Sequence, residues 1–414
     1  MYTYNISSIP GFNEICVSND NCNSNILKLN KVECRTNSSL YKVVRYDKDC
    51  LCVDLIPSYG LCRSVIINSD DRVVGFSPPK SLKAENFMVK HPILCSDNIV
   101  IQEFIEGTMI NVFFDPSIGL TGGWEISTRN TVGATSTFYK SSSSKTFRDM
   151  FMEACSECKL DINQLDQELC YSFVLQHPEN RIVVPFNKPN LYLVAVYKIL
   201  GGNTDNVNVE SYNVEDFIHF FNEKGILVKF PEAYKFENYS MLLEKFGSMN
   251  TPYHVVGVVI HNRQTGERTK IRNPVYEQVR HLRGNQPKLQ YQYLCLRKEG
   301  KVKDFLKYYP ENKSDFSKFR DQVHLFTQTL YSNYVSCYIK KEKPLIEFSE
   351  QYRTHMFNIH QIYMNNLREK RQFINNTLVQ KYVNELHPSL LMYCLNFQMR
   401  KRNVDNIKAT DESN

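Results

Sequence analysis

Between about residues 40 and 275, apolar and polar residues alternate in short segments, which is the pattern of half-buried β-strands. Segments 101–105 and 109–114 flank Glu106 and Gly107, and a glycine turn between two such segments predicts a β-hairpin. A helix is expected to begin near Thr146. The other expected strands, some of them wholly apolar, are 41–46, 63–67, 72–76, 124–128, 181–184, 191–197, 254–260 and 268–272.

After about residue 313 the apolar residues recur three or four positions apart, behind Ser314 or Asp315, either of which can cap a helix. Segments 345–370 and 373–399 show the same period, so a helical C-terminal domain is expected. The predicted parts are an N-terminal extension (1–40), a strand-rich domain (41–283), a basic connector (284–312), a helical domain (313–402) and a disordered tail (403–414).

Composition narrows the class of protein. The 414 residues suffice for two domains, and no segment approaches the roughly 20 apolar residues of a membrane span. Residues 1–14 lack the features of a signal peptide, so we expect a cytoplasmic protein without a membrane partner. The thirteen cysteines are scattered, and Cys50-x-Cys52 lies too far from Cys155-x-x-Cys158 for a local zinc site, so no metal ligand is assigned. Abundant Asn, Lys, Ile and Tyr indicate an AT-rich genome, such as that of a large DNA virus or a protist.

The segment with the clearest candidate chemistry is Phe104-Ile-Glu106-Gly107-Thr108. It resembles the K-x-[DE]-G turn of covalent nucleotidyltransferases, in which a lysine amine attacks the α-phosphate of a nucleotide and forms a phosphoramidate. Glu106 and Gly107 match that turn, whereas Phe104 stands at the lysine position. A phenyl ring has no lone pair that could attack phosphorus, so this route to a covalent intermediate is not expected.

Further segments, in the same order, resemble the RNA ligase family of T-even phages from about Tyr41 to Arg283. Tyr171–Val183, for example, is similar to the family's F-E-F-V-x-P-x-N-R-I-V. The other matching segments are Leu61–Ile67, Pro79–Phe87, Trp124–Arg129, Val256–Val259 and Lys270–Arg272. The resemblance implies an α+β fold, with an RNA ligase-like nucleotidyltransferase domain of antiparallel sheets and flanking helices, followed by an all-α C-terminal domain.

The departures from the family pattern concern the positions that carry its chemistry. Phe104 replaces the lysine, while Ser172 and Val256 replace glutamates that the family is expected to use for the ribose and the catalytic metal. On apolar strands, Phe104 and Val256 are also expected to be core residues. Besides Glu106 and Gly107, the retained candidates for nucleotide or phosphate binding are basic: Arg63, Lys80, Arg129, Lys270 and Arg272.

A second candidate surface combines basic side chains, which bind a nucleic-acid backbone, with tyrosines that stack on unpaired bases. Its residues are Arg280, Arg283, Lys288, Tyr291, Tyr293 and Arg297. The alternative interpretation of this segment is a charged connector between two domains.

The favoured interpretation is a catalytically degenerate RNA ligase-like protein that binds RNA or nucleotide phosphates in the former adenylation cleft. It requires no cofactor, and its partners would be RNA and another protein of a viral or RNA-processing assembly, in the cytoplasm, a viral factory or the virion. An active ATP-dependent RNA ligase or capping-type nucleotidyltransferase would need ATP, Mg²⁺ and a different lysine, for which Lys83 and Lys90 are candidates. A structural virion or scaffold protein is the third possibility.

Overall fold

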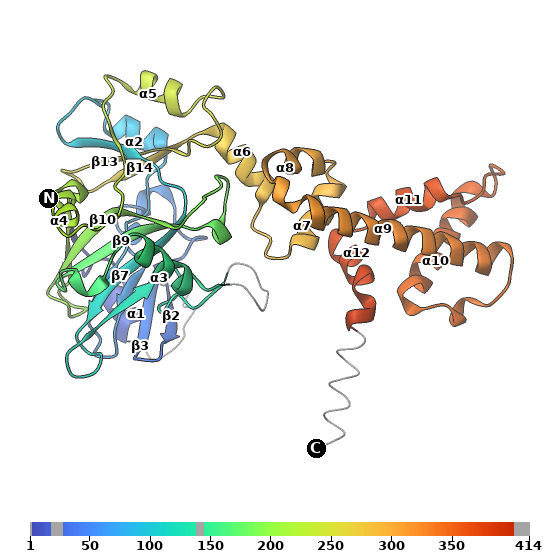
Figure 1. Ribbon diagram of the computed structural model, residues 1–414, viewed down its shortest axis with the longest axis horizontal. Coiled ribbons are helices and arrows are strands. Elements are labelled where there is room, and N and C mark those ends of the chain that lie inside the picture. Colours follow the sequence, from blue (N-terminus) through green and yellow to red (C-terminus); the bar gives the residue numbers. More distant parts are fainter. Residues whose placement is uncertain (1, 18–27, 138–144, 401–414) are drawn as a thin grey trace, which may run out of the picture. The chain divides into compact units, whose positions relative to one another are not determined.

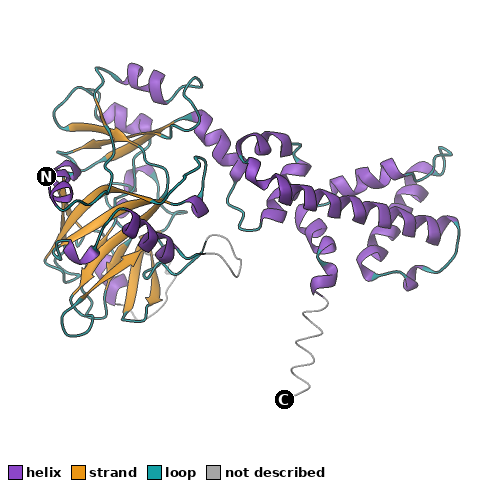
Figure 2. Cartoon of the chain, in the orientation of Figure 1, coloured by secondary structure: helices purple, strands orange, loops and turns teal. Residues whose placement is uncertain are grey.

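Three antiparallel sheets form the first of two units into which the chain divides, Met1–Arg280 and His281–Asn414 (Figure 1). The computed structural model describes residues 2–17, 28–137 and 145–400. Strands occur in the first unit, whereas the described part of the second is helical (Figure 2). The α+β fold with antiparallel sheets and a helical C-terminal part is therefore confirmed. The predicted tail, 403–414, lies outside the described residues.

Each sheet joins strands that are distant in the sequence. The six-stranded sheet has the order β1 (Tyr2–Asn5), β11 (Asn208–Tyr212), β10 (Asn190–Leu200), β9 (Leu169–Gln176), β7 (Thr108–Asp115) and β8 (Gly123–Ser127). The β14 sheet has the order β12 (Ala233–Tyr234), β6 (Ile99–Glu103), β13 (Gly257–Asn262) and β14 (Arg268–Arg272). The β3 sheet has the order β2 (Leu29–Arg35), β3 (Leu40–Tyr46), β4 (Val65–Ile67) and β5 (Val73–Phe76).

The six-stranded sheet buries both of its faces. Alternate residues of a strand point to opposite faces, so Cys170 belongs to the core shared with the β3 sheet, while Tyr171 and Phe173 belong to the core under α3 (Phe147–Glu157). Thr146 caps α3 in a capping box with Asp149, which confirms the helix start expected from the sequence. The other helices of this unit are α1 (Phe12–Val17), α2 (Ala84–Lys90), α4 (Ile218–Glu223) and α5 (Tyr239–Phe246).

The predicted hairpin around Glu106 and Gly107 is wrong, because the two strands belong to different sheets. β6 pairs with β12 and β13, whereas β7 pairs with β8 and β9. Gly107 makes the crossing possible: its φ is +148°, and a Cβ there would lie 2.4 Å from the carbonyl oxygen of Leu175. The turn that carries the candidate chemistry is thus the point where the chain passes from the β14 sheet to the six-stranded sheet.

The predicted strand 181–184 is also wrong. This segment is irregular, and the Glu106 carboxylate takes the place of a neighbouring strand by accepting hydrogen bonds from the amides of Val183 (2.9 Å) and Val184 (3.0 Å). An apolar sequence alone does not distinguish a strand from a buried loop whose amides bond to a side chain.

Two predicted boundaries differ from the structure. Residues 2–5 and 29–35, within the predicted extension 1–40, form the edge strands β1 and β2, because their apolar side chains complete the core of the first unit. The predicted connector 284–312 contains α7 (Leu289–Lys298) and α8 (Val302–Tyr308), whose Tyr293, Leu294 and Phe305 are buried. The helical part therefore begins well before residue 313.

The remaining helices are α6 (Pro274–Arg283), which contains the division between the units, and α9 (Lys313–Tyr334), α10 (Glu350–Ile362), α11 (Asn376–Glu385) and α12 (Pro388–Leu395). The turns Val335–Ile339 and Tyr363–Leu367, after α9 and α10, are π-helical. Among the described residues, the helices are too short or too polar to cross a membrane.

Candidate functional site

Phe104 lies directly after β6, and its amide donates a hydrogen bond to the carbonyl of Gly257 (3.0 Å). Its ring is partly exposed and is covered by cations of β14. The Lys270 amine lies 4.4 Å from the ring centroid and the Arg272 guanidinium carbon 5.4 Å from it. The expectation that Phe104 is a core residue is therefore wrong, because its ring serves as a cation–π surface.

The charges of four other cations act on Lys270, which lies over this ring. Arg268, Lys270 and Arg272 project from the same face of β14, since residues two apart in a strand point the same way. Arg63, which precedes β4, and Lys80, which follows β5, complete the set, and their charges act on Lys270. We call Arg63, Lys80, Arg268, Lys270 and Arg272 the cation cluster.

Burial and mutual repulsion disfavour the charged state of these side chains. Burial, followed by the charges of Arg268 and Arg63, lowers the pKa of Lys270 well below its ordinary value. Burial and the neighbouring Arg268 lower the pKa of Arg63 to about 10. The pKa of Lys80 is lowered in the same direction by burial and then by Arg63. Because burial and repulsion raise the free energy of the charged side chains, a bound anion would stabilise the cluster.

Counter-ions are scarce in the cluster. Arg272 pairs with Glu277 at 3.1 Å, and that carboxylate also pairs with Arg280 at 3.2 Å. In the described part of the chain, no carboxylate forms an ion pair with the cluster's other members, Arg63, Lys80, Arg268 and Lys270. Arg268 is only 7% exposed, and its Nε has no hydrogen-bond partner. Buried charges are ordinarily paired, so this set is suited to an anionic ligand.

Arg129 lies beside the cluster. Its guanidinium donates a hydrogen bond to the Tyr46 hydroxyl (2.9 Å) and lies 5.3 Å from the centre of that ring, and its charge contributes to lowering the pKa of Arg63. The structure thus brings together all five basic residues expected from the sequence. The sequence analysis did not identify Arg268 or Arg45 as site residues. Burial, followed by the charge of Arg129, lowers the pKa of Arg45. The period of two along β14 could have identified Arg268 as a neighbour of Lys270.

Glu106 has a structural role in this arrangement. Besides the amides of Val183 and Val184, the Tyr276 hydroxyl hydrogen-bonds to its carboxylate, and burial raises the pKa of Glu106. Together with Gly107, it fixes the crossing between sheets that presents Phe104. Glu106 is 5% exposed, and these hydrogen bonds position the turn that presents Phe104.

The other two positions at which the chain departs from the family pattern, Ser172 and Val256, are buried. Ser172 is completely buried on β9 and donates a hydrogen bond to Asn111 (2.8 Å), which in turn donates to Ser127 (3.5 Å). Val256 is 8% exposed, as expected of a core residue. Neither side chain offers a carboxylate. Among the described residues no group of three or more His, Cys, Asp or Glu side chains is placed to hold a metal ion.

The second candidate surface is only partly exposed. Tyr293 is 3% exposed, and its ring packs against Phe316 at 5.1 Å and Phe319 at 5.9 Å, so the prediction that it stacks on bases is corrected. Burial lowers the pKa of Arg283, which the nearby Tyr309 and Glu311 partly oppose. Lys288 is exposed before α7, while Tyr291 hydrogen-bonds to Cys295 and Arg297 hydrogen-bonds to Tyr293.

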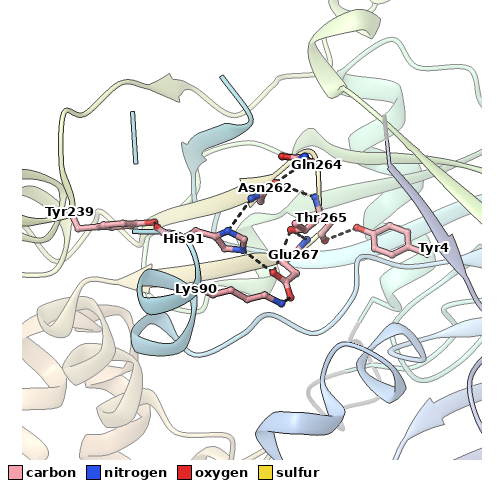
Figure 3. Close-up of polar contacts among 9 residues, drawn as sticks. Tyr4, Lys90, His91, Tyr239, Asn262, Gln264, Thr265 and Glu267 are labelled. Carbon is pink, nitrogen blue, oxygen red and sulfur yellow. Dashed lines mark hydrogen bonds and ion pairs between the residues drawn. The ribbon is translucent and has the colours of Figure 1, made fainter. Parts of the chain in front are cut away.

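The alternative nucleophiles are not at the turn either. Lys83 is an exposed residue before α2, and Lys90, at the end of that helix, pairs with Glu267 at 2.5 Å (Figure 3). His91 reaches the same carboxylate at 2.8 Å and accepts a hydrogen bond from Asn262 (3.1 Å). This network fastens the end of α2 to the turn between β13 and β14.

No protein-family model matches this chain. It is 25% identical over 317 residues to an RNA ligase of Rhodothermus phage RM378, which covers 69% of this chain and 68% of the relative. It is 24% identical over 260 residues to the immediate-early protein ICP-46 homolog of Invertebrate iridescent virus 6, covering 58% of this chain and about half, 54%, of that protein.

Among solved structures, an archaeal ATP-dependent RNA ligase matches with a TM-score of 0.40 and 12% identity, over 70% of this chain and 67% of the other. The Naegleria gruberi RNA ligase with PPi matches with a TM-score of 0.35 and 12% identity, over 49% and 57%. By sequence, then, the chain is similar to a phage RNA ligase and to an iridescent virus protein.

Proposed function

We propose that this protein binds phosphates of RNA or of a nucleotide non-covalently in the cation cluster and does not form a nucleotidyl-lysine at position 104. The observation that carries the proposal is the Lys270 amine 4.4 Å from the Phe104 ring, within a set of largely unpaired cations. The phenyl ring partly compensates these charges through its electron-rich face, and the negative charges of a chain of phosphates would compensate more of them.

The ligand class follows from the number and kind of donors. Arginines bind phosphate oxygens in a bidentate manner, and lysines add point charges, so the cluster suits a chain of phosphates better than a single carboxylate. RNA and nucleoside polyphosphates both present such a chain. The similarity to a phage RNA ligase supports RNA as the partner, and the basic residues of the helical unit support contact with a polyanion longer than one nucleotide.

Magnesium fits the site poorly. Mg²⁺ in phosphate-binding sites is usually held by one or two protein carboxylates together with the phosphates. The matched positions supply a Ser172 hydroxyl that already donates to Asn111, and the isopropyl group of Val256. Glu106 already accepts three hydrogen bonds. Binding to the cation cluster is therefore proposed to proceed without a protein-held metal ion.

One observation favours an active enzyme as a second candidate. The Lys270 amine has a strongly lowered pKa and lies over the ring that replaces the usual lysine, and a desolvated amine beside other cations is a nucleophile. In that case Lys270 would attack the α-phosphate and release pyrophosphate. Incubation of the full chain with radiolabelled ATP or GTP and Mg²⁺, followed by denaturing electrophoresis, separates the two candidates.

The proposed function predicts no covalently labelled protein, together with RNA binding that weakens when Arg63, Lys80 and Arg272 are changed to alanine. A labelled band that disappears in Lys270→Arg would overturn the non-covalent proposal in favour of the enzyme. Unchanged RNA affinity in the triple variant would remove the cation cluster as a binding site and leave a structural role.

A further inference from the structure

We infer that a second pocket, next to the cation cluster, binds a nucleoside phosphate, with its phosphate on Lys80 and Arg268. The pocket lies where the N-terminal strand β1 and the β13–β14 turn face the segments 56–61 and 79–82. Its volume is about 540 Å³, within the range of small-molecule sites. We call it the β1 pocket. The inference rests on the proposed function, since Lys80 and Arg268 serve both sites.

The lining of the β1 pocket is chemically mixed. It includes the apolar side chains Ile56, Pro57, Leu61 and Leu82, which suit the flat face of a base. It also includes Lys80 and Arg268, and Lys90 paired with Glu267. A lining that combines apolar side chains with cations matches a nucleoside phosphate, which is flat and apolar at one end and doubly charged at the other.

Arg268 shows that the cationic part of the lining is suited to a ligand. It is 7% exposed, has no carboxylate partner among the described residues, and its Nε lacks a hydrogen-bond partner. Two nearby tyrosines, Tyr4 and Tyr197, act on its charge, but a phenol does not neutralise a guanidinium. A buried, unpaired arginine that lines a pocket is costly unless an anion reaches it.

The turn that carries Arg268 is held in place from both sides (Figure 3). Tyr4 donates a hydrogen bond to the carbonyl of Gly266 (2.8 Å), and a Cβ at Gly266 would lie 2.3 Å from the Tyr2 ring, so β1 packs closely on the turn. From the other side, Lys90 and His91 contact the Glu267 carboxylate. The charge of Lys90 also neutralises this acidic residue of the pocket lining. The pocket is therefore formed before a ligand binds.

The pocket can receive either a free nucleotide or the end of an RNA strand, because both present a base and a terminal phosphate. The test uses the full chain and isothermal titration with AMP, the 5′-phosphorylated dinucleotide pApA, unphosphorylated ApA and inorganic tripolyphosphate. Binding of AMP indicates a free-nucleotide site. Binding of pApA without AMP indicates an RNA end. Equal binding of ApA and pApA overturns the inference, because the cations would then have no role.

Three variants locate the site. Ser8→Trp places a large ring in the pocket from an exposed position and is expected to weaken the phosphorylated probe at least ten-fold without changing the melting temperature. Lys90→Ala leaves the Glu267 carboxylate of the lining without this counter-ion and is expected to weaken binding of the probe three- to ten-fold. Lys83→Ala changes an exposed lysine outside the pocket lining and should not weaken it. No effect of Ser8→Trp and Lys90→Ala would overturn the inference.

The same set distinguishes this inference from the proposed function. Lys270→Ala should weaken the binding of tripolyphosphate, because this ligand is expected to contact only the cation cluster. Ser8→Trp should leave tripolyphosphate binding unchanged. If Lys270→Ala weakens tripolyphosphate binding but Ser8→Trp does not weaken nucleotide binding, the inference about the β1 pocket is refuted and the proposal for the cation cluster is supported. If Ser8→Trp weakens nucleotide binding but Lys270→Ala does not weaken tripolyphosphate binding, the proposal for the cation cluster is refuted and the inference about the β1 pocket is supported.

Discussion

Removing part of the cation cluster should change the salt dependence of RNA binding by an amount that follows from the number of cations removed. Each phosphate neutralised on a single strand contributes about −0.7 to the slope of log affinity against log salt. The cluster holds five cations, so a single strand that contacts all of them gains a slope of about −3.5 from this site. In Arg63→Ala/Lys80→Ala/Arg272→Ala only two remain, and the contribution falls to about −1.4.

The slopes convert into affinities. Raising the salt four-fold, from about 50 to about 200 mM, should cost the native site about 130-fold and the triple variant only about seven-fold. Contacts of the helical unit add equally to both slopes, so the difference of about two is the prediction. Fluorescence anisotropy with a labelled, 5′-phosphorylated hexaribonucleotide measures it.

The control is a triple alanine variant of exposed lysines in the same unit, Lys188, Lys224 and Lys245, which are absent from the charges acting on Lys270. Its slope should equal that of the native protein. Melting curves establish that both variants are folded. A slope difference below about 0.7 between native protein and cluster variant would mean that less than one phosphate contact was lost, and the reasoning would be refuted.

Three further outcomes follow from the site. Gly107→Ala should destabilise the first unit by about 1–3 kcal/mol in urea melts, because the new Cβ meets the Leu175 carbonyl; an unchanged midpoint would contradict the strained crossing. Lowering the pH from about 7 to about 5 should destabilise the protein, because unfolded His261 takes up a proton near pH 6.5 whereas burial and Arg268 lower its folded pKa to about 3; His261→Gln should flatten this pH dependence. Phe104→Lys should remain unlabelled by radioactive ATP, since Ser172 and Val256 still lack the carboxylates; a labelled band would show that the lysine alone had been missing.

The sequence predicted the kinds of elements better than their partners. Alternation identified most strands of the first unit, and helical spacing identified the C-terminal helices, because both patterns are local. The partner of a strand is a long-range property. Segments 101–105 and 109–114 looked like a hairpin, yet they pair with β13 and β9, which follow much later in the chain.

The same limit applies to the site. Lys270 and Arg272 could be placed near Phe104 only through the resemblance to RNA ligases, and the structure brings all three together. Arg268 was missed because a basic residue at a strand start resembles an exposed charge, whereas its environment is set by Tyr4 and Tyr197 from distant strands. Tyr293 was misassigned because the sequence alone does not show whether a tyrosine packs in a protein core, as its ring does against Phe316, or is exposed to stack on a base.

The phenyl ring at position 104 also bears on what another side chain could do there. A lysine in its place would bring another amine to a position where Lys270 is already only weakly basic, and would remove the ring that offsets its charge. The cations that a nucleotide would need therefore oppose a charged lysine at this position. Phe104 and the cation cluster thus form one electrostatic unit, in which a change of the ring alters the basicity of Lys270.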